Sequence, residues 1–529
     1  MPTRRAFLQT LAAAATVSAA PAPKPNFLVI LADDMGFSDA RCYGGDIDTP
    51  NLDRLAAGGV RFTQAYSTAR CGPSRSCLLT GYYAQQTACD VMTPGNVPSY
   101  TKFLPEYLKP LGYRSYHSGK WHIRFTPREG VGFDRSYTLL DEDRYFTPRR
   151  LELDGVRLPQ PKPEDHYYTT VAIADYGVRF LQEHARDHAR DPFLLYLAPH
   201  APHFPLQALP EDIARYRDRF AEGWDTARER KHARMRRMGL VNCALAPLEP
   251  NMWTRWNTPD EELFAKIGPG EVTRAVRWST LTPAQKDFQR TKMAIHAAMI
   301  TRVDLEIGKV LRQVQAMGAE RDTVVVFLSD NGASSEQMIR GDGHDAAAPP
   351  GSARSFLGLG PGWASASNSP FRLHKSWVNE GGIASPLIVH WPNGIKDRNQ
   401  LRHDPCHFVD LVPTLVDLAG GDPRSEGAPP LAGRSIAPAF QKDGAAPRDF
   451  LYFNHNNNRA IRAGDSKLIA TGENGPWELY DMSADRCEQH DLAGANPGRV
   501  RELAAMWQAR DTEYIRVREA APPTKKPRM

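Results

Sequence analysis

The sequence predicts an α/β protein, with a doubly wound domain followed by a smaller α+β subdomain. Two observations support this fold class in a chain of 529 residues, which is long enough for more than one domain. Apolar runs of strand length alternate with helical patterns over most of the chain. From about residue 449 the pattern changes to closely spaced short strands and a final helix.

Apolar runs define the strands of the large domain. The first is almost entirely apolar, as expected of a strand that is covered on both faces of a sheet. The predicted strands cover residues 26–32, 113–118, 193–198, 323–329 and 386–390. A helix begins at Thr49-Pro50 and ends at Gly58-Gly59. Longer helices are predicted at residues 284–317 and 407–419, each followed by a glycine that stops it.

The change of pattern sets the domain boundaries. The short strands of the second part cover residues 451–453, 460–462, 467–470 and 478–481, followed by a helix at residues 499–518. Residues 420–447 are rich in Gly, Pro and Ala and are interpreted as a linker. We therefore expect a large domain at residues 24–425 and a C-terminal subdomain, a small antiparallel sheet plus a helix, at residues 445–529.

The composition is that of an ordinary globular protein. The chain carries 66 basic and 61 acidic side chains, a net charge of +5, and 41% of its residues are hydrophobic, which excludes a disordered or collagen-like chain. The near balance of charge argues against a nucleic-acid-binding protein, which would show a basic stripe. The last basic residues, Lys525, Lys526 and Arg528, are interpreted as a frayed end rather than a binding arm.

The first twenty residues are typical of an export signal. Arg4 and Arg5 precede a mildly apolar stretch, and small residues follow at Ser18 and Ala20. The stretch is too short and too polar to span a membrane. The paired arginines resemble a twin-arginine signal, so we expect residues 1–20 to be removed after the twin-arginine export machinery delivers a periplasmic or secreted bacterial protein.

Polar side chains follow four of the predicted strands, at the edge where open α/β sheets bind ligands. Each residue alone is also typical of a helix cap or a surface loop. Because they gather at four strand ends, we interpret them together as a candidate site. They are Asp33 and Asp34, Lys120 and His122, His200 and His203, and Asp330 and Asn331.

The residue types at these ends indicate a hard divalent cation. Carboxylates and an amide oxygen suit Ca²⁺ or Mg²⁺ better than zinc. Two adjacent aspartates, Asp33 and Asp34, cannot both be buried and charged without a cation to neutralise them. Because the usual zinc-binding patterns are absent, His122 and His203 are interpreted as proton donors or anion binders.

One cysteine stands apart from the rest. The chain has seven cysteines, so at least one has no disulfide partner, and Cys71 is the candidate. In Cys71-Gly72-Pro73-Ser74-Arg75, Pro73 predicts a helix whose N-terminus holds Cys71, a position that favours an anion. Two interpretations follow from the residues: a thiolate nucleophile with a depressed pKa, or a buried structural cysteine.

On these residues the sequence resembles the type I sulfatases, the formylglycine-dependent branch of the alkaline-phosphatase-like superfamily. Cys71-Gly-Pro-Ser-Arg75, followed by Leu79-Thr80-Gly81, matches the motif that directs conversion of cysteine to formylglycine. The resemblance implies a sulfatase catalytic domain with a central mixed sheet, and it is strongest toward bacterial arylsulfatases. It spans residues 25–491 and includes residues 26–34, 119–122, 201–207, 329–332, 360–375 and 477–481, and Lys375 with Glu380-Gly381-Gly382.

The resemblance implies hydrolysis of sulfate esters, either small molecules or saccharides, to an alcohol or phenol plus sulfate. A formylglycine-generating enzyme would mature Cys71, and the aldehyde hydrate would be the nucleophile. One hydroxyl attacks sulfur and displaces the alcohol or phenol, which leaves a sulfate ester on residue 71. The second hydroxyl then loses its proton, and collapse to the aldehyde expels sulfate. The family binds one divalent cation, usually Ca²⁺. The implied metal ligands are Asp33, Asp34, residue 71, Asp330 and Asn331.

The other implied catalytic residues bind charge or move protons. Arg75 would fix the hydrate, while Lys120 and Lys375 would bind sulfate oxygens. His203 would protonate the leaving oxygen, and His122 would take the proton in the elimination step. Asp330 would also help to deprotonate the attacking hydroxyl.

Several alternatives stay open. His200 is the fallback for His203, because both follow a proline in a duplicated motif. Arg124, where many relatives have glycine, either forms a surface ion pair or reaches toward the substrate. A phosphonate monoester or phosphodiester hydrolase would use the same hydrate. A catalytically inactive protein that binds sulfated ligands is disfavoured because Cys71 and Arg75 are retained.

Overall fold

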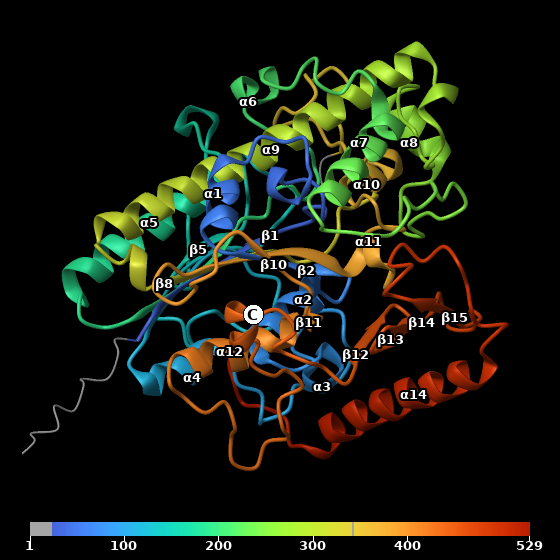
Figure 1. Ribbon diagram of the computed structural model, residues 1–529. Coiled ribbons are helices and arrows are strands. Elements are labelled where there is room, and N and C mark those ends of the chain that lie inside the picture. The colour runs from blue at the N-terminus through green and yellow to red at the C-terminus, as the bar shows by residue number, and fades with distance from the viewer. Residues whose placement is uncertain (1–23, 341–342) are drawn as a thin grey trace, which may run out of the picture.

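The computed structural model describes residues 24–340 and 343–529 (Figure 1). The predicted export signal at residues 1–20 lies outside the described residues. The large domain is built on a mixed sheet of eleven strands within the described chain, in the order β10-β2-β9-β8-β1-β7-β3-β4-β5-β6, with β11 paired to β2. The strands are β1 (Asn26–Ala32), β2 (Val60–Tyr66), β3 (Arg114–Lys120), β4 (Arg135–Leu139), β5 (Leu151–Leu153), β6 (Val156–Arg157), β7 (Phe193–Ala198), β8 (Thr323–Ser329), β9 (Ala384–His390), β10 (Gln400–Arg402) and β11 (Cys406–His407).

The centre of the sheet is parallel and fully buried. Strand β1 pairs in parallel with β7 and β8, and its Val29 lies opposite Tyr196 and Val326. Leu28 and Ile30 pack into the core on one side of the sheet, whereas Val29 packs into the core on the other side. This explains why β1 reads as a continuous apolar run, and it confirms the predicted doubly wound class.

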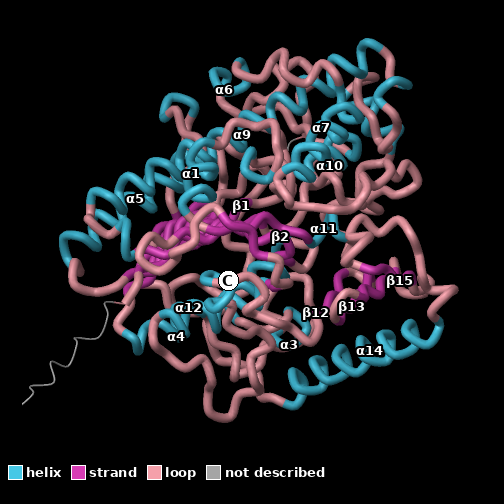
Figure 2. The backbone as a smooth tube through the Cα atoms, in the orientation of Figure 1, coloured by secondary structure: helices cyan, strands magenta, loops and turns pink. Residues whose placement is uncertain are grey.

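Helices cover both faces of the sheet (Figures 1 and 2). The upper layer in this view contains α1 (Pro50–Gly58), α5 (Thr169–Asp187) and α9 (Pro283–Ala316), and the lower layer contains α2 (Cys71–Thr80), α3 (Ala84–Thr87), α4 (Leu104–Leu108) and α12 (Leu411–Leu418). The remaining helices of this part are α6 (Pro210–Ala214), α7 (Gly223–Arg237), α8 (Asp260–Ile267), α10 (Pro361–Ser367), α11 (Glu380–Ile383) and α13 (Ala437–Gln441).

A smaller antiparallel sheet follows, as the sequence predicts. Its order is β12-β13-β14-β15, and α14 (Pro497–Ala520) packs beside it (Figure 1). The strands are β12 (Leu451–His455), β13 (Asn458–Ala463), β14 (Ser466–Ala470) and β15 (Glu478–Asp481). A disulfide joins Cys243 to Cys487, so the loop after α7 is tied to the segment after β15. The other five cysteines, Cys71 among them, are free and buried.

Some element boundaries differ from the sequence prediction. Strand β3 extends to Lys120, so this lysine ends the strand rather than following it. The helix predicted from residue 407 begins with a 3-10 turn at Phe408–Asp410, and α12 starts only at Leu411. Strands β2, β4, β5, β6, β10 and β11 were not predicted, because they are short or carry charged and polar residues.

The segment after α14 is not a frayed end, which corrects the interpretation of its basic residues. It runs back along the large domain: the N–H of Thr524 donates to Val97 O (2.8 Å) and the N–H of Met529 donates to Arg124 O (2.9 Å). Lys526 forms an ion pair with Glu106. Figure 1 shows this end of the chain beside the helices of the lower layer rather than at the tip of α14.

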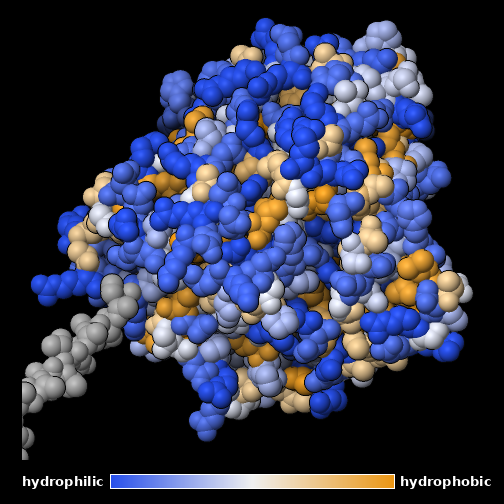
Figure 3. Space-filling model, viewed as in Figure 1, coloured by the Kyte–Doolittle hydropathy of each residue, from blue (hydrophilic) through white to orange (hydrophobic). Residues whose placement is uncertain are grey.

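The described helices and one face of the surface can be compared with what a membrane-spanning helix requires. Within residues 24–340 and 343–529, no helix has the length and apolar character needed to cross a bilayer. On the face seen in Figure 3, hydrophobic residues form small groups separated by hydrophilic ones.

Candidate active site

The ends of β1, β3 and β8 bring five of the predicted polar side chains into one buried cluster, and His203, after β7, faces it. Asp33 and Asp34 follow β1, Lys120 ends β3, and Asp330 with Asn331 follows β8. These five side chains are almost completely buried. We call them, with Arg75, Lys375 and Cys71, the active-site cluster.

Cations pair with the buried aspartates. Arg75 Nη2 lies 2.8 Å from Asp330 Oδ2 and 3.3 Å from Asp33 Oδ2. Lys120 Nζ lies 2.5 Å from Asp33 Oδ2. Burial alone would raise the pKa of Asp33, but Lys120 and the other nearby cations hold that pKa below its usual value. Asp33 is therefore ionised at neutral pH.

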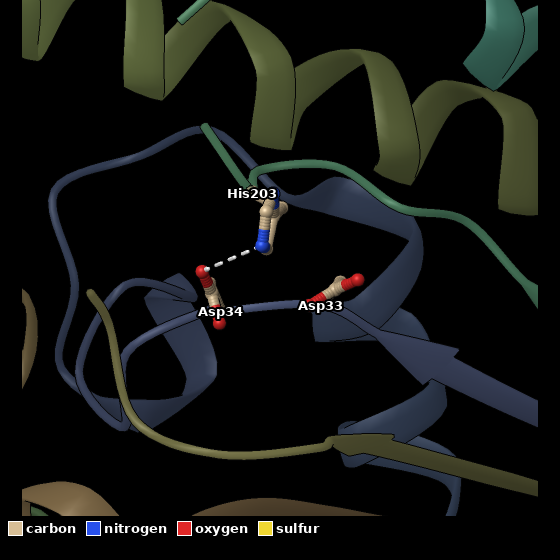
Figure 4. Close-up of side chains that lie close together, drawn as sticks. All are labelled: Asp33, Asp34 and His203. Atoms are coloured by element: carbon tan, nitrogen blue, oxygen red, sulfur yellow. Dashed lines mark ion pairs between the residues drawn. The ribbon is translucent and has the colours of Figure 1, made fainter. Parts of the chain in front are cut away.

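Asp34 is held by partners from three other segments. Asn331 Nδ2 donates to Asp34 Oδ1 (2.7 Å), and Lys375 Nζ lies 2.9 Å from Asp34 Oδ2. His203 Nε2 lies 3.8 Å from the same oxygen, and Figure 4 shows the two side chains facing each other across the site. The backbone of Asp34 adopts a left-handed conformation (φ 63°), which is strained for a residue with a Cβ and is typical of functional sites.

Lys375 reaches the cluster from a compact loop before β9. The loop folds tightly because a Cβ on Gly381 would lie 2.1 Å from Leu373 O and a Cβ on Gly382 would lie 2.0 Å from Trp377 O. Only glycine fits at either position. The glycines that follow Lys375 in the sequence therefore shape the loop that carries it.

Cys71 is the first residue of α2 and is 1% exposed. Its sulfur and one oxygen each of Asp33 and Asp330 lie within 4.8 Å of one another. Burial raises the pKa of the Cys71 thiol, although Lys120 and Lys375 act in the opposite direction. A thiolate with a depressed pKa, one of the two interpretations from the sequence, is therefore not supported.

The oxygens of the cluster fit a hard divalent cation. Asp33 Oδ1 and Asn331 Oδ1 are buried and have no hydrogen-bond donor among the described residues. Burial and the charge of Asp33 raise the pKa of Asp330 well above its usual value, so a nearby cation would be needed to keep it ionised. Carboxylate and amide oxygens of this kind suit Ca²⁺ or Mg²⁺, and a cation would satisfy the unpaired acceptors.

The two candidate histidines occupy different surroundings. His203 faces Asp34, whereas the His200 ring stacks on Tyr145 with its centroid 3.9 Å away. Neither ring nitrogen of His200 has a hydrogen-bond partner among the described residues, and burial lowers the pKa of His200 to about 3. His122, after β3, is part-exposed and lies with Nδ1 3.8 Å from Glu142 Oε2.

Two acidic residues of the site were missed by the sequence analysis. Glu142 forms an ion pair with Lys120, and Glu336 Oε2 lies 2.9 Å from Lys375 Nζ. Glu142 follows β4. It would have been included with the other polar residues at strand ends if this polar strand had been recognised from the sequence. Glu336 lies in an irregular loop and no motif marks it.

A cavity of about 620 Å³ opens beside the cluster and gives access to it. Lys120 and His122 line it, together with Arg124, whose guanidinium donates to Thr93 O (2.7 Å) and Gly95 O (3.1 Å). Arg124 therefore lies at the cavity and makes no surface ion pair within the described chain, so the salt-bridge interpretation is wrong.

Comparison with known proteins identifies the relatives of this chain. Residues 25–421 match the family described as sulfatase, and residues 372–510 match the family described as the C-terminal part of N-sulphoglucosamine sulphohydrolase. An uncharacterized sulfatase of Schizosaccharomyces pombe is 31% identical over 93% of this chain and 94% of its own length.

Other relatives carry the name of a specific sulfatase activity. An arylsulfatase of Klebsiella aerogenes is 29% identical over 79% of this chain and 91% of its own length. An N-acetylglucosamine-6-O-sulfatase of Bacteroides thetaiotaomicron is 26% identical over 89% of this chain and 83% of its own length. The crystal structure of Ps i-CgsB with k-i-k-neocarrahexaose has a TM-score of 0.65 at 24% identity, covering 92% of this chain and 93% of that one, and it shares the fold.

Proposed function

The chain belongs to the sulfatase family and is a sulfate ester hydrolase, and from that premise we propose that it cleaves sulfate monoesters with a formylglycine made from Cys71. The products are an alcohol or phenol and inorganic sulfate, and a sulfate ester on residue 71 divides the reaction into two steps. The observation that carries the proposal is the position of Cys71: it begins α2 within 4.8 Å of oxygens of Asp33 and Asp330.

A divalent cation, Ca²⁺ in preference to Mg²⁺, completes the proposed site. Asp33, Asp34, Asp330, Asn331 and residue 71 would hold it, because they present oxygen ligands in a buried cluster and two of these oxygens have no other donor within the described chain. The cation would supply charge neutralisation for the sulfuryl oxygens.

The cationic side chains bind the sulfate group in this proposal. Lys120 and Lys375 are buried and remain protonated, because the adjacent carboxylates raise the pKa of each despite the cost of burial. Each ammonium group donates to sulfate oxygens and offsets the charge that develops on them in the transition state. Arg75, fixed by Asp330 and by the carbonyl oxygen of Lys120, orients the hydroxyl groups of residue 71.

Two histidines move protons in the proposed reaction. His203 donates a proton to the leaving oxygen, a role supported by its position 3.8 Å from Asp34. His122 accepts a proton from residue 71 in the elimination step, and Glu142 orients it from 3.8 Å away. Asp330 helps to deprotonate the attacking hydroxyl.

Export to the periplasm or the exterior, through the twin-arginine machinery, is part of the same proposal. It rests on Arg4 and Arg5 in the sequence. The Cys243–Cys487 disulfide supports it, because disulfides persist mainly in oxidising compartments. Maturation of Cys71 by a formylglycine-generating enzyme would precede export.

We expect the substrate to be an aryl sulfate or a saccharide sulfate, because relatives are named for each of these two substrate classes. The test is a panel of an aryl sulfate, an aryl phosphonate monoester and an aryl phosphate diester, assayed with the matured protein. We expect kcat/KM to be highest for the sulfate and to be lost in Cys71→Ala, while Cys406→Ala, which removes a free buried cysteine outside the site, retains turnover. Preference for the phosphonate or the diester would replace the proposal with that activity.

A further inference from the structure

The cavity beside the active site is lined by three arginines that have no acidic partner among the described residues. Arg150, Arg340 and Arg528 line it together with Lys120 and His122. Across residues 24–340 and 343–529, none of these three arginines forms an ion pair with a carboxylate. Two of the acidic residues on the same wall are engaged: Glu142 pairs with Lys120, and Asp141 accepts the backbone N–H of Arg150.

The wall carries a net positive charge. Five cationic side chains and three acidic ones line the cavity, and a hollow lined mainly by one sign of charge concentrates counter-ions of the opposite sign. The cationic lining residues are Lys120, Arg124, Arg150, Arg340 and Arg528, and the acidic ones are Asp141, Glu142 and Asp143. The proposed function already assigns Lys120 and Lys375 to the scissile sulfate, so the three guanidinium groups that have no carboxylate partner in the described chain are in excess of what one sulfate needs.

Arg528 is held in place by the segment after α14. Its backbone forms a β-bridge with Phe125, and the N–H of the next residue, Met529, donates to Arg124 O (2.9 Å). Two residues earlier, Lys526 pairs with Glu106 and lies over the ring of Phe103, 5.0 Å from its centroid. The backbone of residues 524–529 is therefore held against the large domain. This lowers the entropy cost of ordering Arg528 when it binds a ligand.

Arg340 enters from another segment and lies close to the reacting groups. Its guanidinium carbon lies 5.0 Å from the ring centroid of Phe204, the residue after His203. Stacking on an aromatic ring orients the planar guanidinium, and this geometry suits bidentate binding of a carboxylate or a sulfate.

We propose that Arg528, together with Arg150 and Arg340, binds a second oxyanion of the substrate, next to the sulfate ester that is cleaved. The inference rests on the proposed sulfatase activity and narrows its substrate class: the substrate carries at least two anionic groups, the scissile sulfate and a further sulfate or carboxylate. Residues 521–529 thus act in specificity, although they lie far from the formylglycine motif in the sequence.

The test compares three aryl sulfates that differ in one substituent: none, a second sulfate, or a carboxylate. The wild-type protein is expected to show a higher kcat/KM for one or both dianionic esters, and the better of the two identifies the second group. Arg528→Ala and Arg340→Ala are each expected to reduce kcat/KM for the preferred dianionic ester by about fivefold more than for the monoanionic ester. Lys525→Ala, on the same segment but outside the cavity, should alter neither.

Three results would overturn the inference. The wild-type protein could show no preference for either dianionic ester, or Arg528→Ala could reduce all three rates equally. Discrimination that persists unchanged at high ionic strength would also contradict it, because Arg150 and Arg528 are exposed, Arg340 is part-exposed, and salt screens exposed charges. Failure of the wild-type protein to hydrolyse any of the three esters would refute the proposed function itself, which separates the two failures.

Discussion

Two buried clusters of charged side chains in this molecule differ in how completely their oxygens are paired. The active-site cluster lies at the ends of β1, β3 and β8, as described above. The second, which we call the junction cluster, consists of Glu380, Lys467, Arg486 and Glu488 and lies between α11 and the small sheet (Figure 1). All four of its side chains are buried.

Every carboxylate oxygen of the junction cluster has a donor. Lys467 Nζ lies 2.9 Å from Glu380 Oε1 and 2.7 Å from Glu488 Oε1, and Arg486 Nε donates to Glu380 Oε2 (2.8 Å). Asn379 Nδ2 donates to Glu488 Oε2 (2.9 Å). Burial would raise the pKa of Glu380, but Lys467 and Arg486 reverse the effect and lower it to about 2.

The active-site cluster is incomplete by the same measure. Asp33 Oδ1 and Asn331 Oδ1 have no donor within the described residues. Burial raises the pKa of one carboxyl group in each cluster, Asp330 here and Glu488 in the junction cluster, so the difference lies in the unpaired oxygens. Burial of charge therefore does not by itself mark a functional site. Unpaired carboxylate and amide oxygens, which a cation would satisfy, distinguish the proposed catalytic cluster from the junction cluster.

The largest expected effect is a loss of turnover when a residue of the active-site cluster is replaced. Asp33→Asn removes a proposed metal ligand, and we expect turnover of an aryl sulfate to fall by about three orders of magnitude or more, because metal charge stabilisation is worth several kcal/mol. Ca²⁺ binding measured by titration calorimetry should weaken in parallel, with native circular dichroism retained. Asp422→Asn, at an exposed aspartate, is the matched control. Full activity in Asp33→Asn would remove the catalytic assignment from this cluster.

The second prediction sharpens the assignment within the active site. His203→Ala should lower kcat by about a hundredfold for esters with poor leaving groups and much less for activated aryl esters, because only the former need a proton on the leaving oxygen. His200→Ala should lack this dependence on the leaving group, since its ring packs on Tyr145 rather than facing Asp34. If the dependence follows His200 instead, the two histidines exchange roles.

The smallest effect on turnover is expected in the junction cluster. Lys467→Met leaves two buried carboxylates without their shared cation and should cost about 3–5 kcal/mol in the free energy of unfolding, measured by urea denaturation. Turnover per folded molecule should not change. Lys442→Met, at an exposed lysine, provides the control for loss of a positive charge. Loss of turnover without loss of stability would mean that the junction cluster participates in catalysis.

The comparison also explains which parts of the molecule were predictable. Strands β1, β7 and β8 were found with their observed bounds because they are buried on both faces and read as apolar runs, and the polar residues after them identified the site. Strand β4 carries a charged and polar sequence, so it was missed, and Glu142 was missed with it. Polar residues at strand ends reveal a candidate site only where the strand itself is recognised from the sequence.

Long-range partners could not be inferred from one sequence. Lys375 was identified through its resemblance to a family motif, but Glu336, its partner, has no such motif. The Cys243–Cys487 disulfide spans 244 residues, and spacing alone does not choose a partner among seven cysteines. Arg528 reaches the cavity only because residues 521–529 turn back over the large domain.

The central claim is that residue 71 acts as formylglycine, and mass spectrometry of the tryptic peptide from residue 71 to Arg75 tests it most directly. The protein would be isolated from its native host and analysed beside the peptide from Cys71→Ser, which marks the unmodified backbone. The account predicts a peptide that has lost its sulfur and carries an aldehyde or its hydrate. An intact cysteine in protein that hydrolyses sulfate esters would contradict it.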